Sequence, residues 1–321
     1  MQFTRIPDSW SVLGAPLVYA FTASRSDFDL RIASPDGATL YGAKRFAAAT
    51  EASVDIAPCL RRALAFAPSA GPTGVCSAAG RRIEAVVQLT DRASGRSVAA
   101  PVRCFVAAAE PVTAPALLTA MPRNRLIPAG ACDELTLLTD GPLDVALRVE
   151  YGLRTATGTH RLPAAGLHLF RLDTADFAGA DRITVDAGAC GTVLYSLTPP
   201  VQEAVRLAWR SRAGSIEHYT FPVETTAGLT ATRLEACGPE GRVVRTTAAP
   251  YRTLRSALER REVLEALSEL LVTPEVWLVE GARCTPVVVT GDRAVVHAYG
   301  ALRTLEVTVC PKTKPAQPWS C

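Results

Sequence analysis

Hydrophobic and polar residues alternate along much of the chain, and this period of two is typical of half-buried β-strands. Residues 143–149 (LDVALRV) and 305–309 (LEVTV) show the alternation most clearly. Shorter segments predict further strands at 28–32, 86–89, 102–106, 135–137 and 167–172. Turn-forming clusters of Gly, Pro, Asp and Ser separate the strands at 34–37, 91–95, 140–142 and 238–241. The pattern predicts a mainly β protein built from sandwiches or barrels.

One segment, 257–271, has the periodicity of an amphipathic helix. Leu264, Leu267 and Leu271 fall on one stripe. Ser256 followed by Glu259 has the form of a capping box, and a proline at 274 closes the segment. The polar face, expected to meet solvent or a neighbouring subunit, carries Glu259, Arg260, Glu262, Glu265 and Glu269. A shorter helical turn is predicted after Asp55, with Pro58 in its first turn.

The length of 321 residues suits two or three domains. Small residues and prolines at 107–115 predict a linker, and the prolines at 199 and 200 close a second β unit. Residues 67–74 are expected to form an exposed loop of the first unit. The predicted organisation is a β-sandwich-like domain at 1–110, another at 111–200, a barrel-like α+β domain at 201–310 with helix 257–271, and an extended tail at 311–321.

Composition excludes some classes of protein. Hydrophobic residues make up 48% of the chain, which excludes a disordered protein. The balance of 34 basic and 31 acidic side chains, a net charge of +3, argues against a nucleic-acid partner. Arginine pairs such as Arg61-Arg62 and Arg81-Arg82 are isolated from aromatic residues. Lysine occurs only at 44, 312 and 314, and we interpret the excess of arginine as a coding bias.

The nine cysteines are spread evenly, at 59, 76, 104, 132, 190, 237, 284, 310 and 321. None forms a C-x-x-C unit, so no metal site is predicted. The count is odd and the N-terminus lacks the apolar stretch of a secretory signal. We therefore expect free, mostly buried thiols in a protein folded in reducing cytoplasm. No apolar run approaches the roughly 18–20 residues of a membrane span.

Catalytic chemistry has little support in the sequence. His160 is expected in a turn, whereas His168, His218 and His297 are expected in strands, all with structural roles. Motifs of serine hydrolases, metalloproteases, P-loop proteins and dinucleotide-binding folds are absent. Cys59 near Arg61 is a candidate activated thiol without an identified base. The pairs Asp27/Asp29 and Asp181/Asp186 read as strand-end or turn residues. We predict no catalytic, cofactor-binding or metal-binding residue, although an enzyme with a scattered site stays open.

The most informative segment is 205–221. Val205, Leu207 and Trp209 alternate on one strand, a loop with Gly214 follows, and a second strand ends in an aromatic pair. These features predict a β-hairpin. The predicted helix and further strands at 273–279, 285–290 and 305–309 follow it.

This segment resembles tail-tip proteins of the distal-tail or baseplate type, found in tailed phages and prophages of Bacteroidetes-type hosts. In that family a Trp strand, a Gly loop and an aromatic Y-x-F strand precede a helix, a T-P-E-V exit and a P-V-V-V strand. The matching residues here are Trp209, Gly214, Tyr219, Phe221, Leu267, Leu270, 273–276 (TPEV) and 286–289 (PVVV). Similar stretches occur at 15–21, 37–40, 54–58, 122–125 and 128–135.

The resemblance implies a virion structural protein that is made in the host cytoplasm and located in the tail. Its C-terminal domain would join copies into a ring linking the tail tube to tip proteins. The implied partners are copies of itself and neighbouring tail proteins, with no cofactor. The alternative is a multidomain adhesion or carbohydrate-binding protein of immunoglobulin-like sandwiches.

Overall fold

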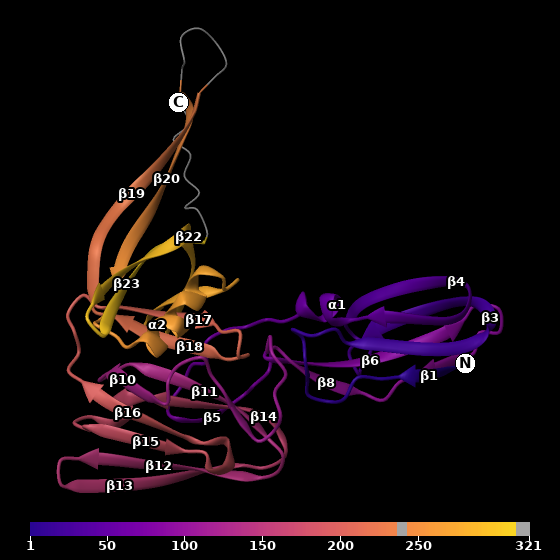
Figure 1. Ribbon diagram of the computed structural model, residues 1–321, viewed down its shortest axis with the longest axis horizontal. Coiled ribbons are helices and arrows are strands. Elements are labelled where there is room, and N and C mark those ends of the chain that lie inside the picture. The colour runs from indigo at the N-terminus through magenta and orange to yellow at the C-terminus, as the bar shows by residue number, and fades with distance from the viewer. Residues whose placement is uncertain (236–242, 313–321) are drawn as a thin grey trace.

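The protein is mainly β, as the alternating pattern predicts: the computed structural model has 58% strand and 8% helix. The structure describes residues 1–235 and 243–312. The predicted turn at 238–241, Cys237, Cys321 and most of the predicted tail at 311–321 lie outside these residues. The described chain has the outline of an L, with the N-terminal strands in one limb and the remaining sheets in the other (Figure 1).

The N-terminal sheet has seven strands, with β3 and β6 at its centre. Its core includes Tyr19, Phe21 and Phe28 from β3, and helix α1 packs beside them with Leu60. Pro58 occupies the first turn of α1, which confirms the helical turn predicted after Asp55. The elements are β1 (Gln2–Arg5), β2 (Ser11–Val12), β3 (Val18–Ala33), β4 (Leu40–Asp55), α1 (Ala57–Arg61), β6 (Arg82–Asp91), β7 (Ser97–Ala99) and β8 (Arg103–Val106).

Two sheets face each other in the middle of the chain and enclose one core. In the five-stranded sheet the order is β10-β16-β15-β12-β13, and in the four-stranded sheet it is β5-β14-β11-β9. Leu135 of β11 and Phe170 of β14 meet Val145 and Ile183 of the opposite sheet. The strands are β5 (Gly74–Cys76), β9 (Ala116–Leu118), β10 (Asn124–Pro128), β11 (Cys132–Thr139), β12 (Leu143–Tyr151), β13 (Arg154–Leu162), β14 (Gly166–Asp173), β15 (Arg182–Asp186) and β16 (Thr192–Thr198). Short 3-10 turns lie at Thr174–Phe177 and Gly188–Cys190.

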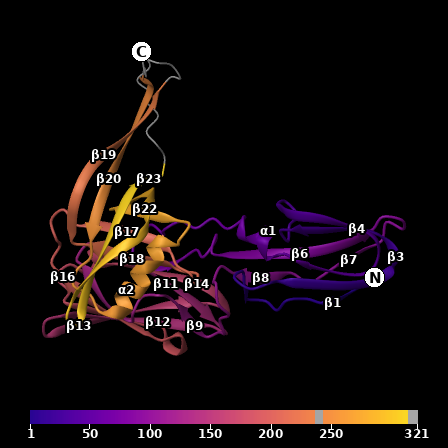
Figure 2. The ribbon, with the colours of Figure 1, turned by 45° about the horizontal axis from the view of Figure 1, so that its top comes forward.

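The C-terminal sheet has seven strands in the order β18-β17-β21-β22-β23-β20-β19, and α2 packs against it (Figure 2). β17 and β18 form the hairpin predicted over 205–221. Gly214 in its loop has a φ of +90°, a conformation that glycine adopts without strain. The elements are β17 (Val205–Arg210), β18 (Ile216–Phe221), β19 (Val223–Glu235), β20 (Val243–Arg255), α2 (Arg261–Ser268), a 3-10 turn (Glu269–Leu271), β21 (Val276–Glu280), β22 (Arg283–Tyr299) and β23 (Leu302–Pro311).

The helix predicted over 257–271 is shorter than expected, and its predicted capping box is wrong. α2 begins at Arg261, and its N-cap residue makes no side-chain capping bond. Both predicted capping residues are engaged elsewhere: Ser256 Oγ accepts a hydrogen bond from the Leu305 amide at 2.9 Å, and Glu259 accepts one from the Tyr219 hydroxyl at 2.8 Å. Glu259 also forms a β-bridge with Arg303. Tertiary contacts therefore keep residues 257–260 out of the helix.

The segment 67–74, expected as an exposed loop of the first unit, is anchored to the middle sandwich instead. Arg171 of β14 donates to the carbonyl oxygens of Ser69 and Gly71, each at 2.6 Å. β5 follows immediately and pairs with β14. Residues 66–77 therefore leave the N-terminal sheet, complete a sheet of the middle sandwich and return to β6.

Candidate functional site

The described histidines do not form a catalytic group. His160 lies in strand β13 and not in the expected turn, because it pairs with Val145 and packs its ring edge against Phe170. His168 and His297 lie in strands β14 and β22, as predicted. His218, also in a predicted strand, is buried beside Glu134.

Thiols and acidic pairs likewise have structural surroundings. The seven described cysteines are free, but only Cys132 and Cys190 are buried, so the expectation of mostly buried thiols was too strong. Arg61, the expected activator of Cys59, donates its Nε to the Leu13 carbonyl at 2.6 Å. Within the described chain, no group of three or more His, Cys, Asp or Glu side chains could hold a metal ion.

The predicted acidic pairs make local structural contacts. Asp27 accepts a hydrogen bond from the Ala48 amide, and Asp29 pairs with Arg45 at 3.1 Å. Asp181 and Asp186 accept hydrogen bonds from the backbone amides of glycines in neighbouring turns. Asp181 and Asp186 flank β15 (Arg182–Asp186), which agrees with the predicted strand-end role, whereas Asp27 and Asp29 lie inside β3 and the same prediction is wrong for them.

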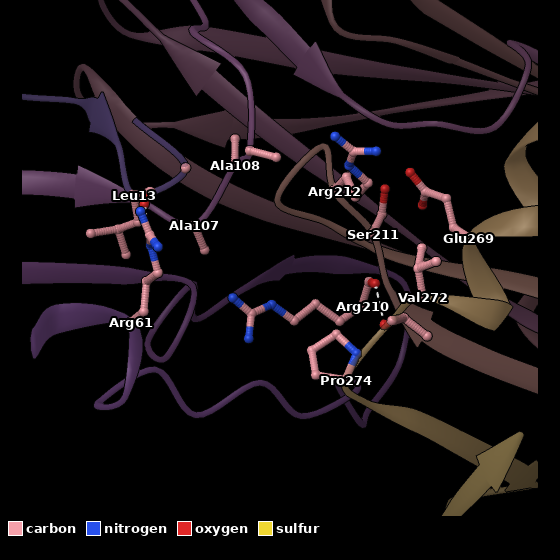
Figure 3. Close-up of a pocket in the computed structure, with 13 residues that line it drawn as sticks. Leu13, Arg61, Ala107, Ala108, Arg210, Ser211, Arg212, Glu269, Val272 and Pro274 are labelled. Atoms are coloured by element: carbon pink, nitrogen blue, oxygen red, sulfur yellow. Dashed lines mark hydrogen bonds between the residues drawn. The ribbon is translucent and has the colours of Figure 1, made fainter. Parts of the chain in front are cut away.

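A crevice of about 260 Å³ lies where the two limbs meet (Figure 3). Three arginines line it, Arg61, Arg210 and Arg212, together with the carboxyl group of Glu269. The Arg210 guanidinium lies 4.4 Å from the centre of the Phe66 ring and 3.5 Å from Glu275. Burial raises the pKa of Glu269. The arginines are suited to holding an acidic side chain, and the side chain of Ser211, which also lines the crevice, interacts with Glu269.

The most unusual chemistry of the described chain is a buried ion pair on strand β11. Glu134 is fully buried and pairs with Arg81, which is only 2% exposed. The second oxygen of Glu134 accepts hydrogen bonds from the amide and hydroxyl of Ser69, and it lies 3.6 Å from His218 Nε2. Arg81 also donates to Thr136 and to the Ala67 carbonyl. Glu134 therefore receives contacts from the N-terminal segment and from the C-terminal hairpin.

The neighbouring residue, Asp133, forms a second buried pair on the other face of β11. Arg125 donates to Asp133 at 2.7 Å and lies 3.6 Å from Glu217 of the hairpin. Burial raises the pKa of Asp133, but the charges of Arg125, His218 and Arg206 together with the Arg125 hydrogen bond lower the pKa below its usual value. Glu217 also accepts a hydrogen bond from the Ala120 amide at 2.9 Å. Charges on both faces of β11 thus connect the middle sandwich to the hairpin β17–β18.

Sequence reasoning missed this network. Two adjacent carboxylates on an alternating strand imply one exposed side chain, and Arg81 appeared as half of an ordinary basic pair. The available signal was the sequence of β11 itself, CDELTLLT, where acidic residues begin an apolar strand. All eight of its residues are buried. Such a strand needs buried cationic partners, because an unpaired charge is costly to bury.

The depressed pKa of Glu134 predicts a specific dependence of stability on pH. Burial raises this pKa, but the interactions with His218 and Arg81 outweigh it and lower the pKa to about 2. The stabilisation is therefore complete above about pH 4.5, the ordinary pKa of Glu, and is lost as the pH falls towards 2. We expect Glu134→Gln to flatten the decline in unfolding free energy over this range, measured by urea unfolding at stepped pH. The exposed-site control is Glu262→Gln. If the unfolding free energy falls equally steeply with pH in the parent, in Glu134→Gln and in this control, Glu134 is not the group responsible.

The other distinctive feature is a two-stranded ribbon formed by β19 and β20, which projects from the C-terminal sheet (Figure 1). Each strand has 13 residues. Among the residues that the structure describes, only 252–255 of β20 pair with β23, so no third strand is described beside the outer part of the ribbon. Leu229 is 71% exposed on this outer part. Leu229 thus presents an apolar side chain to solvent on a ribbon of two strands.

The residues that carry the resemblance to phage tail proteins are distributed through the C-terminal core. Trp209, Phe221 and Leu267 are completely buried there. Thr273 at the exit of α2 donates its hydroxyl to the Arg210 carbonyl at 2.6 Å. Most of these positions support the fold of the domain, and Thr273 and Pro274 of the exit also line the crevice.

In comparisons with known proteins, no protein-family model and no curated protein matches the chain. In the described residues, no helix is long and apolar enough to cross a membrane.

Proposed function

We propose that the chain is a structural subunit of a phage tail or of a phage-derived tail device, which assembles with copies of itself into a ring and joins the tail tube to tip proteins. The observation that carries the proposal is the β19–β20 ribbon. A two-stranded ribbon is marginally stable in water by itself. An exposed ribbon with a large apolar side chain is therefore expected to find a protein partner.

The rest of the molecule supports a mechanical role. The buried charges on β11 connect the middle sandwich to the N-terminal segment and to the C-terminal hairpin. Such connections are expected in a subunit that must keep its shape under load. The crevice between the limbs offers arginines that suit an acidic side chain of a partner protein. The tail setting comes from the resemblance carried by Trp209, Gly214 and the 273–276 exit.

The assembly prediction can be tested with a shortened ribbon. Residues 228–251 are replaced by Asn-Gly, which joins the paired residues Ala227 and Arg252 through a two-residue turn. We expect the full chain to form closed rings in native mass spectrometry and negative-stain images. The shortened chain is expected to stay monomeric while keeping its far-ultraviolet circular dichroism.

A monodisperse full-length monomer at high concentration, with no ring and no copurifying tail protein, would contradict the proposal. If that monomer also gave clear hits on a glycan array, the carbohydrate-binding alternative would replace it. Rings formed equally well by the shortened chain would show that the ribbon is not the assembly element.

A further inference from the structure

The described sheets have several long free edges, and most of them are protected against pairing. β4 carries Lys44 and Arg45 along its edge, and the outer part of β20 includes Pro250, which has no amide hydrogen to donate. Charges and prolines of this kind are how natural edge strands avoid pairing with other chains.

Two long edges carry charged residues only towards their ends and lack this protection in their central stretches. β19 ends the C-terminal sheet, and its residues 225–231 (TTAGLTA) contain no charge and no proline. β13 ends the five-stranded sheet of the middle sandwich, and its residues 155–159 (TATGT) are likewise uncharged. All five of these β13 residues are exposed. Within residues 1–235 and 243–312, each strand pairs with a single neighbour, β19 with β20 and β13 with β12.

The two edges also match in the shape of their faces. On β13, Ala156 and Gly158 pair with Val149 and Leu147 of β12 and so lie on the side of the sandwich core. Their small size leaves space above the end of that core. On β19, Leu229 is 71% exposed and lies between Ala227 and Ala231 on one face. If the strands pair, Leu229 covers the space left by the small residues of β13.

The opposite faces of β13 and β19 both carry threonine hydroxyl groups. Thr155, Thr157 and Thr159 share the other face of β13, and Thr226 and Thr230 share the other face of β19. Threonines directly opposite each other on paired strands stabilise the pairing. One alignment therefore satisfies both faces, with threonine opposite threonine and Leu229 over Ala156 and Gly158.

We propose that the edge of β19 in one copy of this chain adds to the edge of β13 in the next copy and extends the middle sandwich by one strand. Figure 1 places the two strands at opposite ends of one limb, so the contact joins different copies. Two different surfaces meet in it, and a head-to-tail contact of this kind generates rings or filaments. The inference rests on the proposed assembly function and identifies the partner of the ribbon.

A test with two blocked variants separates this contact from others. Ala156→Lys places a charge on the β13 edge, and Leu229→Lys places one on the β19 edge; both positions are exposed, so both variants are expected to fold. Each variant alone is expected to lose the ring in native mass spectrometry. An equimolar mixture, with one variant isotopically labelled, is expected to give 1:1 heterodimers, because it contains one intact β19 and one intact β13 edge. Leu153→Lys, at a fully exposed turn beside β13, serves as the matched control and keeps the ring.

The outcomes distinguish the two proposals. If the parent chain forms rings and both lysine variants still form them, the β19–β13 contact is wrong and the assembly function stands. If Ala156→Lys alone forms homodimers, the ribbon pairs with itself and the inference is overturned. A parent chain that remains monomeric overturns both.

Discussion

Replacing Arg81 with Met is expected to lower the unfolding free energy by about 3–5 kcal/mol, because it leaves a buried carboxylate without its cation. Glu134 is fully buried, and Arg81 is its guanidinium partner. Arg81 also donates to Thr136, so a second buried acceptor loses its donor. The measurement is urea unfolding at pH 7, followed by circular dichroism.

The control is the double variant in which Glu134→Leu accompanies Arg81→Met. Replacing both members of a buried pair by apolar residues is often neutral or stabilising, so most of the lost stability is expected to return. Arg82→Met, at the half-exposed neighbour, is expected to change stability by less than about 0.5 kcal/mol. A single variant at position 81 as stable as the parent would show that the pair does not stabilise the fold.

Trp209→Ala is expected to be comparably damaging, at about 3–5 kcal/mol, because it empties the largest side-chain site of the C-terminal core. Trp209 is completely buried and belongs to the cluster that includes Leu267 and Leu270 of the helical segment. Removal of the indole is expected to release α2 from the sheet. The measurements are a thermal melt and the rate of proteolysis within 257–271.

Tyr299→Ala is the matched control, because this aromatic residue is 60% exposed on β22. Its expected effect is within about 0.5 kcal/mol. Equal destabilisation by the two alanine variants would show that the helix does not depend on the Trp209 contact.

The strands were predictable from local pattern, because a period of two reports which face of a sheet is buried. The hairpin around Gly214 was predictable for the same reason, with a glycine where the turn needs a positive φ. The start of α2 was not, because Ser256 and Glu259 have the spacing of a capping box while their partners lie on β23 and β18. The spacing of a local motif carries no information about hydrogen-bond partners that lie far away in the sequence.

The buried charges were beyond prediction for a related reason. Asp133 and Glu134 are separated by many residues from Arg81, Glu217 and His218, and the fold alone brings these side chains together. The unprotected edges of β13 and β19 are visible in the sequence as uncharged, threonine-rich stretches. Their position at the ends of sheets became known only from the strand order.

The excursion of residues 66–77 has a consequence for synthesis on the ribosome. The strands of the N-terminal sheet are complete once β8 has emerged, and domains tend to fold in order of synthesis. The partner of β5, however, is β14, made about a hundred residues later. Glu134, the buried partner of Arg81, is likewise synthesised after the strands of the N-terminal sheet. The N-terminal limb therefore reaches its final form only after the middle sandwich has been translated, which couples the two folding events in time.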